Sequence, residues 1–421
     1  MSAFVRAATV GAALTIVAGA AHAGEPLSLD RALTEAFENN PELLASRQEL
    51  EVARGRLVRA RYLNPFNPEV EGGAARRRFD GGGSDSQRSA GVAIEVEIAG
   101  QRGKRIVEVE RNLARVKAEV ADVERRVRSD VKEAFYGALY QRERLDLFRR
   151  VEELNRRLRD ASTERFRAGE SPKLEANLAV IRYDRSRKDT LAAERDYRSA
   201  LLNLERLVGR DPRGETEVAG SLEVPSIPVD PDRLVEEALR SRPDLQAREA
   251  ELARVDAEID LTRRLIVPNP TLRGAYDEET EAAGSRDRIV GGGVSIPIPI
   301  FDRKQAELTT LGGEKGRARY EREATALRVR TEVRDAWRSY EAARRAVEIF
   351  AEGSAKRIEE SFRFLETAYR VGKIDLLRLA SGENDLIDAE LSYLGSISDY
   401  WVAQVALERA VGSTIGRGAT P

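Results

Sequence analysis

The stretch Val92-Ala-Ile-Glu-Val-Glu-Ile98 alternates strictly between apolar residues and alanine or glutamate. Successive side chains of a strand point to opposite faces, so this pattern predicts one apolar face, with Glu95 and Glu97 on the other. A twin stretch, Val294-Ser-Ile-Pro-Ile-Pro-Ile300, repeats the apolar face and has proline in place of both glutamates. The apolar residues are Val92, Ile94, Val96 and Ile98 in the first stretch, and Val294, Ile296, Ile298 and Ile300 in the second.

Each stretch follows a second extended segment across a loop rich in small and acidic residues. We therefore predict two hairpins, with strands at about 66–79 and 88–98 and at about 268–278 and 288–300. About ten residues per strand suit a tilted strand that spans a membrane. A soluble hairpin that packs one face on helices is the alternative. The secretory N-terminus and the lack of long apolar segments, both described below, favour the membrane.

In a membrane, the apolar residues of both hairpins would face lipid, whereas Glu95 and Glu97 would face a lumen. Four strands cannot close a barrel, and in lipid every strand edge needs a partner. The chain is therefore expected to oligomerise, and three copies would give twelve strands.

Long helices are predicted after each hairpin. Apolar residues from Ile106 to Ala134 recur in alternating steps of three and four, as in a coiled-coil seam. Without an internal proline, a helix over about 102–165 would be about 95 Å long, and its counterpart spans about 303–370. Short turns at 167–172 and 370–375 then lead into returning helices. Gly169 suits a left-handed cap in the first turn, and Ser171 suits the N-cap that follows.

The two halves are copies of each other. Asp30 recurs as Asp232, and Asn67-Pro68 recurs 202 positions later as Asn269-Pro270. Two copies of about 200 residues exceed the period of a solenoid repeat, so each should be a structural half. We divide the chain into a signal peptide (1–23), a first repeat (24–208), a connector (209–230), a second repeat (231–412) and a tail (413–421).

Composition narrows the class of protein. Residues 1–23 have an early Arg6, an apolar run and the ending Ala21-His22-Ala23, typical of a secretory signal. Beyond it the chain has no Cys, His or Met, so no disulfide, lipid-anchored cysteine, zinc-type site or imidazole base is expected. No cofactor is predicted. No later stretch approaches 18 apolar residues, so no transmembrane helix is predicted. With 70 basic and 72 acidic residues, no charge excess favours nucleic acid.

The ordered set of local patterns resembles the outer-membrane efflux proteins of the TolC type, over essentially the whole mature chain. The patterns are Leu29-Asp-Arg-Ala-Leu33 with Asn40-Pro-Glu-Leu43, its repeat Arg242-Pro-Asp-Leu245, the strand end Ser295-Ile-Pro-Ile-Pro-Ile-Phe301, and the two Arg-x-Gly turns. The resemblance implies a mixed α-helical and β-barrel membrane channel rather than an enzyme. A homotrimer would form a twelve-stranded barrel in outer-membrane lipid and a periplasmic α-helical barrel. That α-helical barrel would dock a membrane-fusion adaptor and an inner-membrane RND pump.

Residues 97–105 look like the corresponding segment in channels of cobalt-zinc-cadmium efflux systems, so we predict export of heavy-metal cations. Drug or solvent export, type I protein secretion and a periplasmic coiled-coil scaffold are the alternatives. A phosphate loop is not expected at Gly100-Gln-Arg-Gly-Lys-Arg105, because the glycine spacing and the Ser or Thr are lacking.

The turns supply the remaining site residues. Those predicted to contact the adaptor are Arg167, Gly169, Glu170, Ser171, Arg370, Val371, Gly372 and Lys373. Family members often have an acidic ring just past the second turn, but here that stretch reads Leu377-Arg-Leu-Ala-Ser381. This departure argues against an aspartate ring and leaves charge pairing through Arg378 as a substitute. The gate is assigned to the region of Asp375, Arg378 and Ser381.

Overall fold

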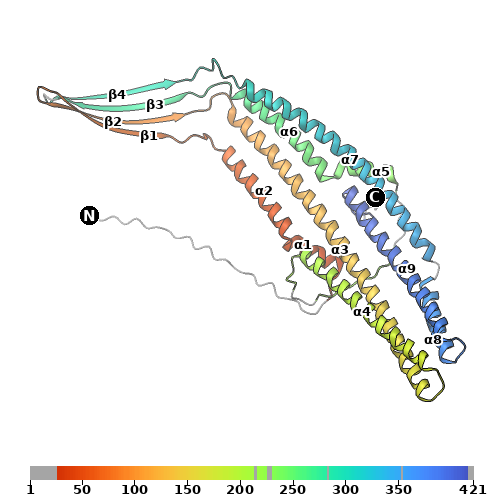
Figure 1. Ribbon diagram of the computed structural model, residues 1–421. Coiled ribbons are helices and arrows are strands. Elements are labelled where there is room, and N and C mark those ends of the chain that lie inside the picture. The colour runs from red at the N-terminus through yellow and green to blue at the C-terminus, as the bar shows by residue number, and fades with distance from the viewer. Residues whose placement is uncertain (1–25, 213–215, 225–229, 282–283, 352–353, 416–421) are drawn as a thin grey trace.

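The computed structural model describes residues 26–212, 216–224, 230–281, 284–351 and 354–415. The predicted signal peptide and most of the predicted tail lie outside these ranges, as do parts of the predicted connector. A four-stranded antiparallel sheet extends from one end of a long helical body (Figure 1). Its strands, in spatial as well as chain order, are β1 (Glu69–Arg78), β2 (Ser84–Glu95), β3 (Thr271–Thr280) and β4 (Arg286–Ser295).

Two of the predicted strands run too far toward the helices. β2 ends at Glu95 and β4 at Ser295, so Val96, Ile98, Ile296, Ile298 and Ile300 lie outside the ladder. The reason is proline chemistry, because a residue without an N–H cannot continue a ladder. The backbone N–H of Val96 still donates to the carbonyl of Pro270 at 3.0 Å, but Pro270 cannot return the bond. Pro297 and Pro299 interrupt the second strand in the same way.

The helices repeat in the same order in both halves. The first half contains α1 (Leu29–Asn39), α2 (Pro41–Ala60), α3 (Gln101–Arg167) and α4 (Lys173–Val208). The second contains α5 (Pro231–Ser241), α6 (Pro243–Arg264), α7 (Gln305–Ala351), α8 (Ser354–Arg370) and α9 (Leu376–Val411). The long helix predicted at about 303–370 is thus described as α7 and α8, on either side of residues 352–353. The predicted class, two repeats that each combine a hairpin with long helices, is confirmed.

Apolar seams hold each half together. Val127 and Val131 of α3 are buried against α1 and α4, and their repeat counterparts Val329 and Val333 of α7 are buried against α5 and α9. The seams leave charged residues outside, which explains how a body so rich in Arg and Glu folds into helices. No helix in the described part of the chain has both the length and the apolar character needed to cross a membrane.

A short bridge ties the start of the described chain to the segment between the halves. The Leu27 N–H donates to the carbonyl of Glu217 at 2.7 Å, and the Ala219 N–H donates to the carbonyl of Leu27 at 3.0 Å. Leu27 is fully buried and Val218 is 3% exposed, both within the apolar cluster of α1, α3 and α4.

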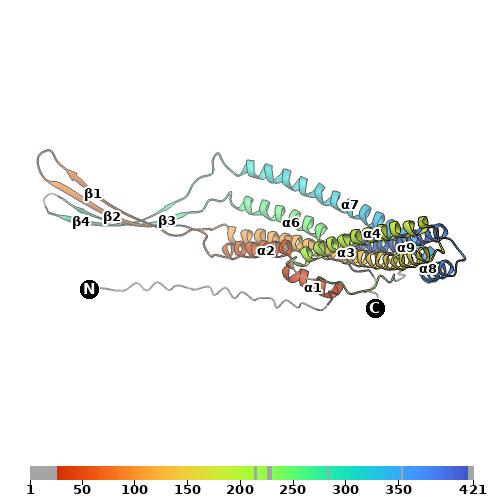
Figure 2. The ribbon, with the colours of Figure 1, turned by 60° about the horizontal axis from the view of Figure 1, so that its bottom comes forward.

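The α3–α4 and α8–α9 turns lie together at the end of the body farthest from the sheet, as the two orientations in Figures 1 and 2 show. We call this end the tip. The molecule therefore has two separate ends that can carry function.

Candidate functional site

The register of the sheet separates its two faces by chemistry. Val92 lies opposite Val70, and Leu272 lies opposite both Ile94 and Val294, so these side chains share one face. Many of them are open to the surroundings, with Val70 83% exposed and Val294 64% exposed. We call this the apolar face; its larger apolar residues are Val70, Val92, Ile94, Leu272, Tyr276, Val290 and Val294. Exposed aliphatic residues on one face of a sheet are typical of contact with lipid.

The opposite face is acidic. Glu95 is one of seven carboxylates on this face, which also carries two arginines, Arg77 and Arg273. The large aliphatic residue on the same face is Ile289. The carboxylates are Glu69, Glu71, Asp85, Glu95, Asp277, Glu279 and Asp287. Of these seven, Glu95 was predicted from the sequence and the other six were not, although period-two alternation through each complete strand indicates all of them.

Glu97, which was predicted to face a lumen, is paired in the structure. It follows the end of β2, its side chain is 7% exposed, and it forms an ion pair with Arg105 of α3. The pair joins the exit from the sheet to the first turns of the long helix. Glu95 has a neighbouring contact, since its Oε1 accepts a hydrogen bond from Asn269 Nδ2 at 2.8 Å.

The two tip turns have the same geometry. Gly169 has a φ of 76° and Gly372 a φ of 74°, a left-handed conformation that glycine adopts without steric cost. In each turn the residue after the glycine donates back to the helix: Glu170 N–H to Arg165 O, and Lys373 N–H to Ala368 O, both at 2.8 Å. The described tip residues are exposed, apart from the partly buried Ser171.

One predicted role in these turns is wrong, and a second residue makes a contact that was not predicted. Ser171 is not the N-cap of α4, because Pro172 occupies the cap position and Ser171 Oγ is buried without a hydrogen-bond partner among the described residues. Asp375, assigned to the gate, caps α9: its Oδ1 accepts from the Arg378 N–H at 2.7 Å. The side chains of Arg378 and Ser381 are exposed.

Near the tip, a buried carboxylate connects α9 with α3 and α4. Glu383 of α9 is 1% exposed and accepts hydrogen bonds from Asn155 of α3 at 2.6 Å and Arg182 of α4 at 2.5 Å. Glu383 was not among the site residues predicted from the sequence. The available signal was its place in the apolar seam that begins with Leu376 and Leu379, where a charge is unusual.

A tyrosine makes a second connection at the tip. Tyr369 of α8 is 3% exposed; its hydroxyl lies 2.8 Å from Ser162 Oγ of α3 and donates to Glu175 Oε1 of α4 at 2.8 Å. Burial raises the pKa of Tyr369, so the phenol keeps its proton and can donate this bond. We call the contacts of Glu383 and Tyr369 the tip bridges.

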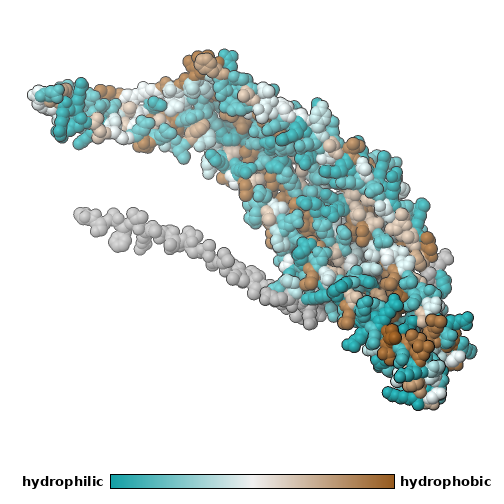
Figure 3. All heavy atoms as spheres, in the orientation of Figure 1, coloured by the Kyte–Doolittle hydropathy of each residue, from teal (hydrophilic) through white to brown (hydrophobic). Residues whose placement is uncertain are grey.

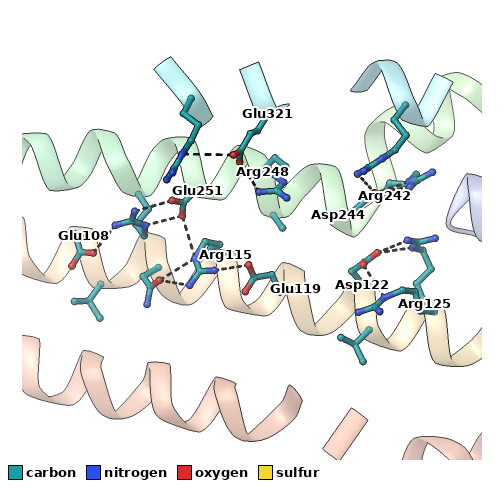
Figure 4. Close-up of a pocket in the computed structure, with 18 of the residues that line it drawn as sticks. Glu108, Arg115, Glu119, Asp122, Arg125, Arg242, Asp244, Arg248, Glu251 and Glu321 are labelled. Atoms are coloured by element: carbon teal, nitrogen blue, oxygen red, sulfur yellow. Dashed lines mark hydrogen bonds and ion pairs between the residues drawn. The ribbon is translucent and has the colours of Figure 1, made fainter. Parts of the chain in front are cut away.

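A hollow of about 1100 Å³ lies between α3, α6 and α7 (Figure 4). Its wall is made of arginines and carboxylates that pair with one another, such as Arg254 with Glu251 at 2.9 Å. Burial alone would raise the pKa of Asp244 at one end, but the hydrogen bond from Arg242 holds that pKa below its usual range. Within the described residues, no three His, Cys, Asp or Glu side chains gather as metal ligands. The hollow therefore lies between the two halves and is lined by charged side chains that pair with one another.

Known proteins share this architecture. A family model described as "Outer membrane efflux protein" matches residues 32–210 and 234–413. The cobalt-zinc-cadmium resistance protein CzcC of Cupriavidus metallidurans is 27% identical over 391 residues, 93% of this chain and 91% of CzcC. The outer membrane efflux protein BepC of Brucella suis is 23% identical over 411 residues, 94% of this chain and 88% of BepC. The solved CmeC outer membrane channel of Campylobacter jejuni has a TM-score of 0.73 at 15% identity, covering 93% of this chain and 87% of CmeC.

Proposed function

Because the chain belongs to the outer membrane efflux protein family, we propose that three copies join their sheets into one twelve-stranded barrel, the exit duct of an efflux system. The open edges of β1 and β4 support this assembly. An unpaired strand edge is unstable in lipid, and β4 of one copy can pair with β1 of the next. The apolar face then contacts lipid, and the acidic face lines the lumen.

The cargo we propose is a heavy-metal cation. The observation that carries this proposal is the acidic face, on which seven carboxylates outnumber two arginines in each copy. A lumen lined by fixed negative charge concentrates cations and repels anions. The similarity to a cobalt-zinc-cadmium resistance protein supports the same cargo. We propose that conduction through the duct is passive, and a duct that only releases cargo has no need to bind it tightly.

Planar bilayers test the lumen. We expect Glu95→Gln/Asp277→Asn to lower the permeability of K⁺ and Zn²⁺ relative to chloride several-fold. A unit charge about 10 Å away contributes roughly 0.4 kcal/mol in water before salt screening, and three copies lose six such charges. Reversal potentials in salt gradients measure the ratio.

The matched control is Glu278→Gln, which removes a carboxylate from the other face of the same strand. It should leave the permeability ratio unchanged. An equal effect of both variants would disprove the assignment of the acidic face to the lumen.

At the other end, we propose that the tip docks a periplasmic membrane-fusion adaptor, which connects the duct to an inner-membrane RND pump. The exposed turns around Gly169 and Gly372 support this role, because a repeated surface at the far end of the body suits a partner that meets the helical end of the trimer. The tip bridges tie α3 and α4 to α8 and α9 within each copy, so we propose that they help to keep the duct closed at this end.

Cross-linking tests the docking site. The chain lacks cysteine, so Glu170→Cys and Lys373→Cys each introduce a unique reactive thiol. Both should capture the adaptor in cells, whereas Leu191→Cys, at a position 59% exposed in the middle of α4, should capture it much less. Capture from Leu191→Cys alone would move the docking site to the side of the body.

A further inference from the structure

The apolar face of the sheet does not stay apolar to its end. Beyond the row that contains Tyr276, the register continues with Arg88, Glu278 and Arg288 side by side, followed by a row with Arg76 and Arg286. Arg78 extends the same face of β1 toward its hairpin loop. We call Arg76, Arg78, Arg88, Arg286 and Arg288 the arginine rows. Figure 3 shows hydrophilic residues gathered at this free end of the sheet.

The arginine rows carry an excess of positive charge. Their described strand neighbours on this face include one acid, Glu278, which lies 3.5 Å from Arg288 and 3.7 Å from Arg286. Five cations therefore face one carboxylate. The side chains of Arg286 and Arg288 are 57% and 64% exposed, so their guanidinium groups are open to another ligand.

The excess of positive charge lies on one face of the sheet and is absent from the other face of the same strand ends. On the opposite face at the same level, Glu279 and Asp287 lie beside each other, and Arg77 lies beside Asp85. Arginines placed only to keep the loops soluble would be distributed over both faces. Their position on the lipid-facing side points to a ligand in the membrane.

The position of the arginine rows along the strands indicates the chemistry of that ligand. Same-face residues along a strand are about 7 Å apart, so the arginines begin one step beyond Tyr276 and Val290. Aromatic residues mark the boundary between hydrocarbon and headgroups in membrane barrels. Phosphate groups lie just past that boundary, and the planar guanidinium binds phosphate oxygens in pairs.

We propose that the arginine rows bind the phosphate-bearing headgroups of anionic lipids in the outer leaflet, so that each copy holds such lipid against the barrel. The proposal rests on the proposed orientation of the sheet, with the apolar face toward lipid. Arg88 and Arg288 flank β3 about 10 Å apart, so one headgroup with two phosphates, or two adjacent headgroups, can engage both.

Native mass spectrometry of the assembled protein in neutral detergent tests the proposal, with phosphatidylglycerol as the probe and phosphatidylcholine of the same chains as reference. The assembled protein should retain phosphatidylglycerol in preference to phosphatidylcholine. Each arginine near an anionic lipid contributes about fivefold in affinity, so Arg88→Gln/Arg288→Gln should weaken retention roughly 30-fold. Arg77→Gln/Arg273→Gln, on the acidic face, should leave it unchanged.

Equal retention of the two lipids, or an equal loss in both double variants, would overturn the proposal. Displacement of the lipid by millimolar inorganic phosphate would also overturn it, by showing a site for free phosphate. If Arg88→Gln/Arg288→Gln fails to assemble, Arg288→Gln alone must still lower retention about fivefold. Bilayer conductance of the same preparations reports the duct separately, so a conducting protein without lipid preference refutes only the lipid site.

Discussion

Glu383→Ala is expected to destabilise the tip by about 3 kcal/mol, because it leaves the guanidinium of Arg182 and the amide of Asn155 without their shared buried acceptor. Asn155 is 3% exposed; its amide keeps the hydrogen bond to the Val151 carbonyl at 3.1 Å, but water cannot replace the lost acceptor without local opening. The α3–α4 hairpin would then separate more readily from α9. We expect a higher single-channel conductance in planar bilayers together with a lower midpoint of unfolding in denaturant.

Glu390→Ala is the matched control, because Glu390 also lies on α9 and pairs with α3. Glu390 pairs with Arg150 of α3 at 2.5 Å, but the Arg150 side chain is 63% exposed, so the pair is worth no more than about 1 kcal/mol. Glu383→Gln keeps an acceptor for Asn155 and should give an intermediate result. Unchanged conductance in Glu383→Ala, despite a lowered midpoint, would show that this tip bridge stabilises the fold without restraining the duct.

Gly209→Ala is expected to destabilise the first repeat by about 3 kcal/mol or more. Gly209 has a φ of 75°, which costs an ordinary L-residue about 1–2 kcal/mol. In addition, a Cβ at this position would lie 2.5 Å from the carbonyl oxygen of Asn39, a backbone atom that cannot rotate away. Thermal unfolding in detergent, followed by circular dichroism, measures the change.

Gly169→Ala separates the two contributions. Gly169 has almost the same φ, 76°, but its Cβ would meet no atom within 4 Å, so only the conformational cost of about 1–2 kcal/mol applies. At the repeat counterpart of Gly209, Gly412, the nearest atom is the flexible Arg242 Cγ at 3.3 Å, and the effect should be intermediate. Equal losses for Gly209→Ala and Gly169→Ala would rule out the steric contact with Asn39.

Local patterns predicted most of the fold because each pattern has a single physical cause. Alternation found the strands, seam spacing found α3, and the glycines located both turns. The boundaries at Glu95 and Ser295 were missed, because the apolar alternation continues past the point where Pro270 removes the partner N–H. Periodicity reports which face a side chain occupies, but it does not report whether the backbone is paired.

Fewer of the site residues than of the fold elements could be predicted from the sequence. Glu97 looks like Glu95 in the alternating stretch, and only the three-dimensional position of Arg105 shows that it is paired. The partners of Glu383 come from α3 and α4, more than 200 positions away, so no local window contains them. The arginine rows likewise emerge only when the register aligns four strands from both halves.

The bridge between Leu27 and Val218 constrains the order in which the polypeptide can mature. Leu27 acquires both of its backbone partners from residues 217–219, which are synthesised after the whole of the first repeat. The first half thus completes its own interior only once residues 217–219, which lead into the second half, have reached the compartment where the chain folds. A fragment that stops at Val208 would lack both backbone hydrogen bonds of Leu27 to residues 217–219.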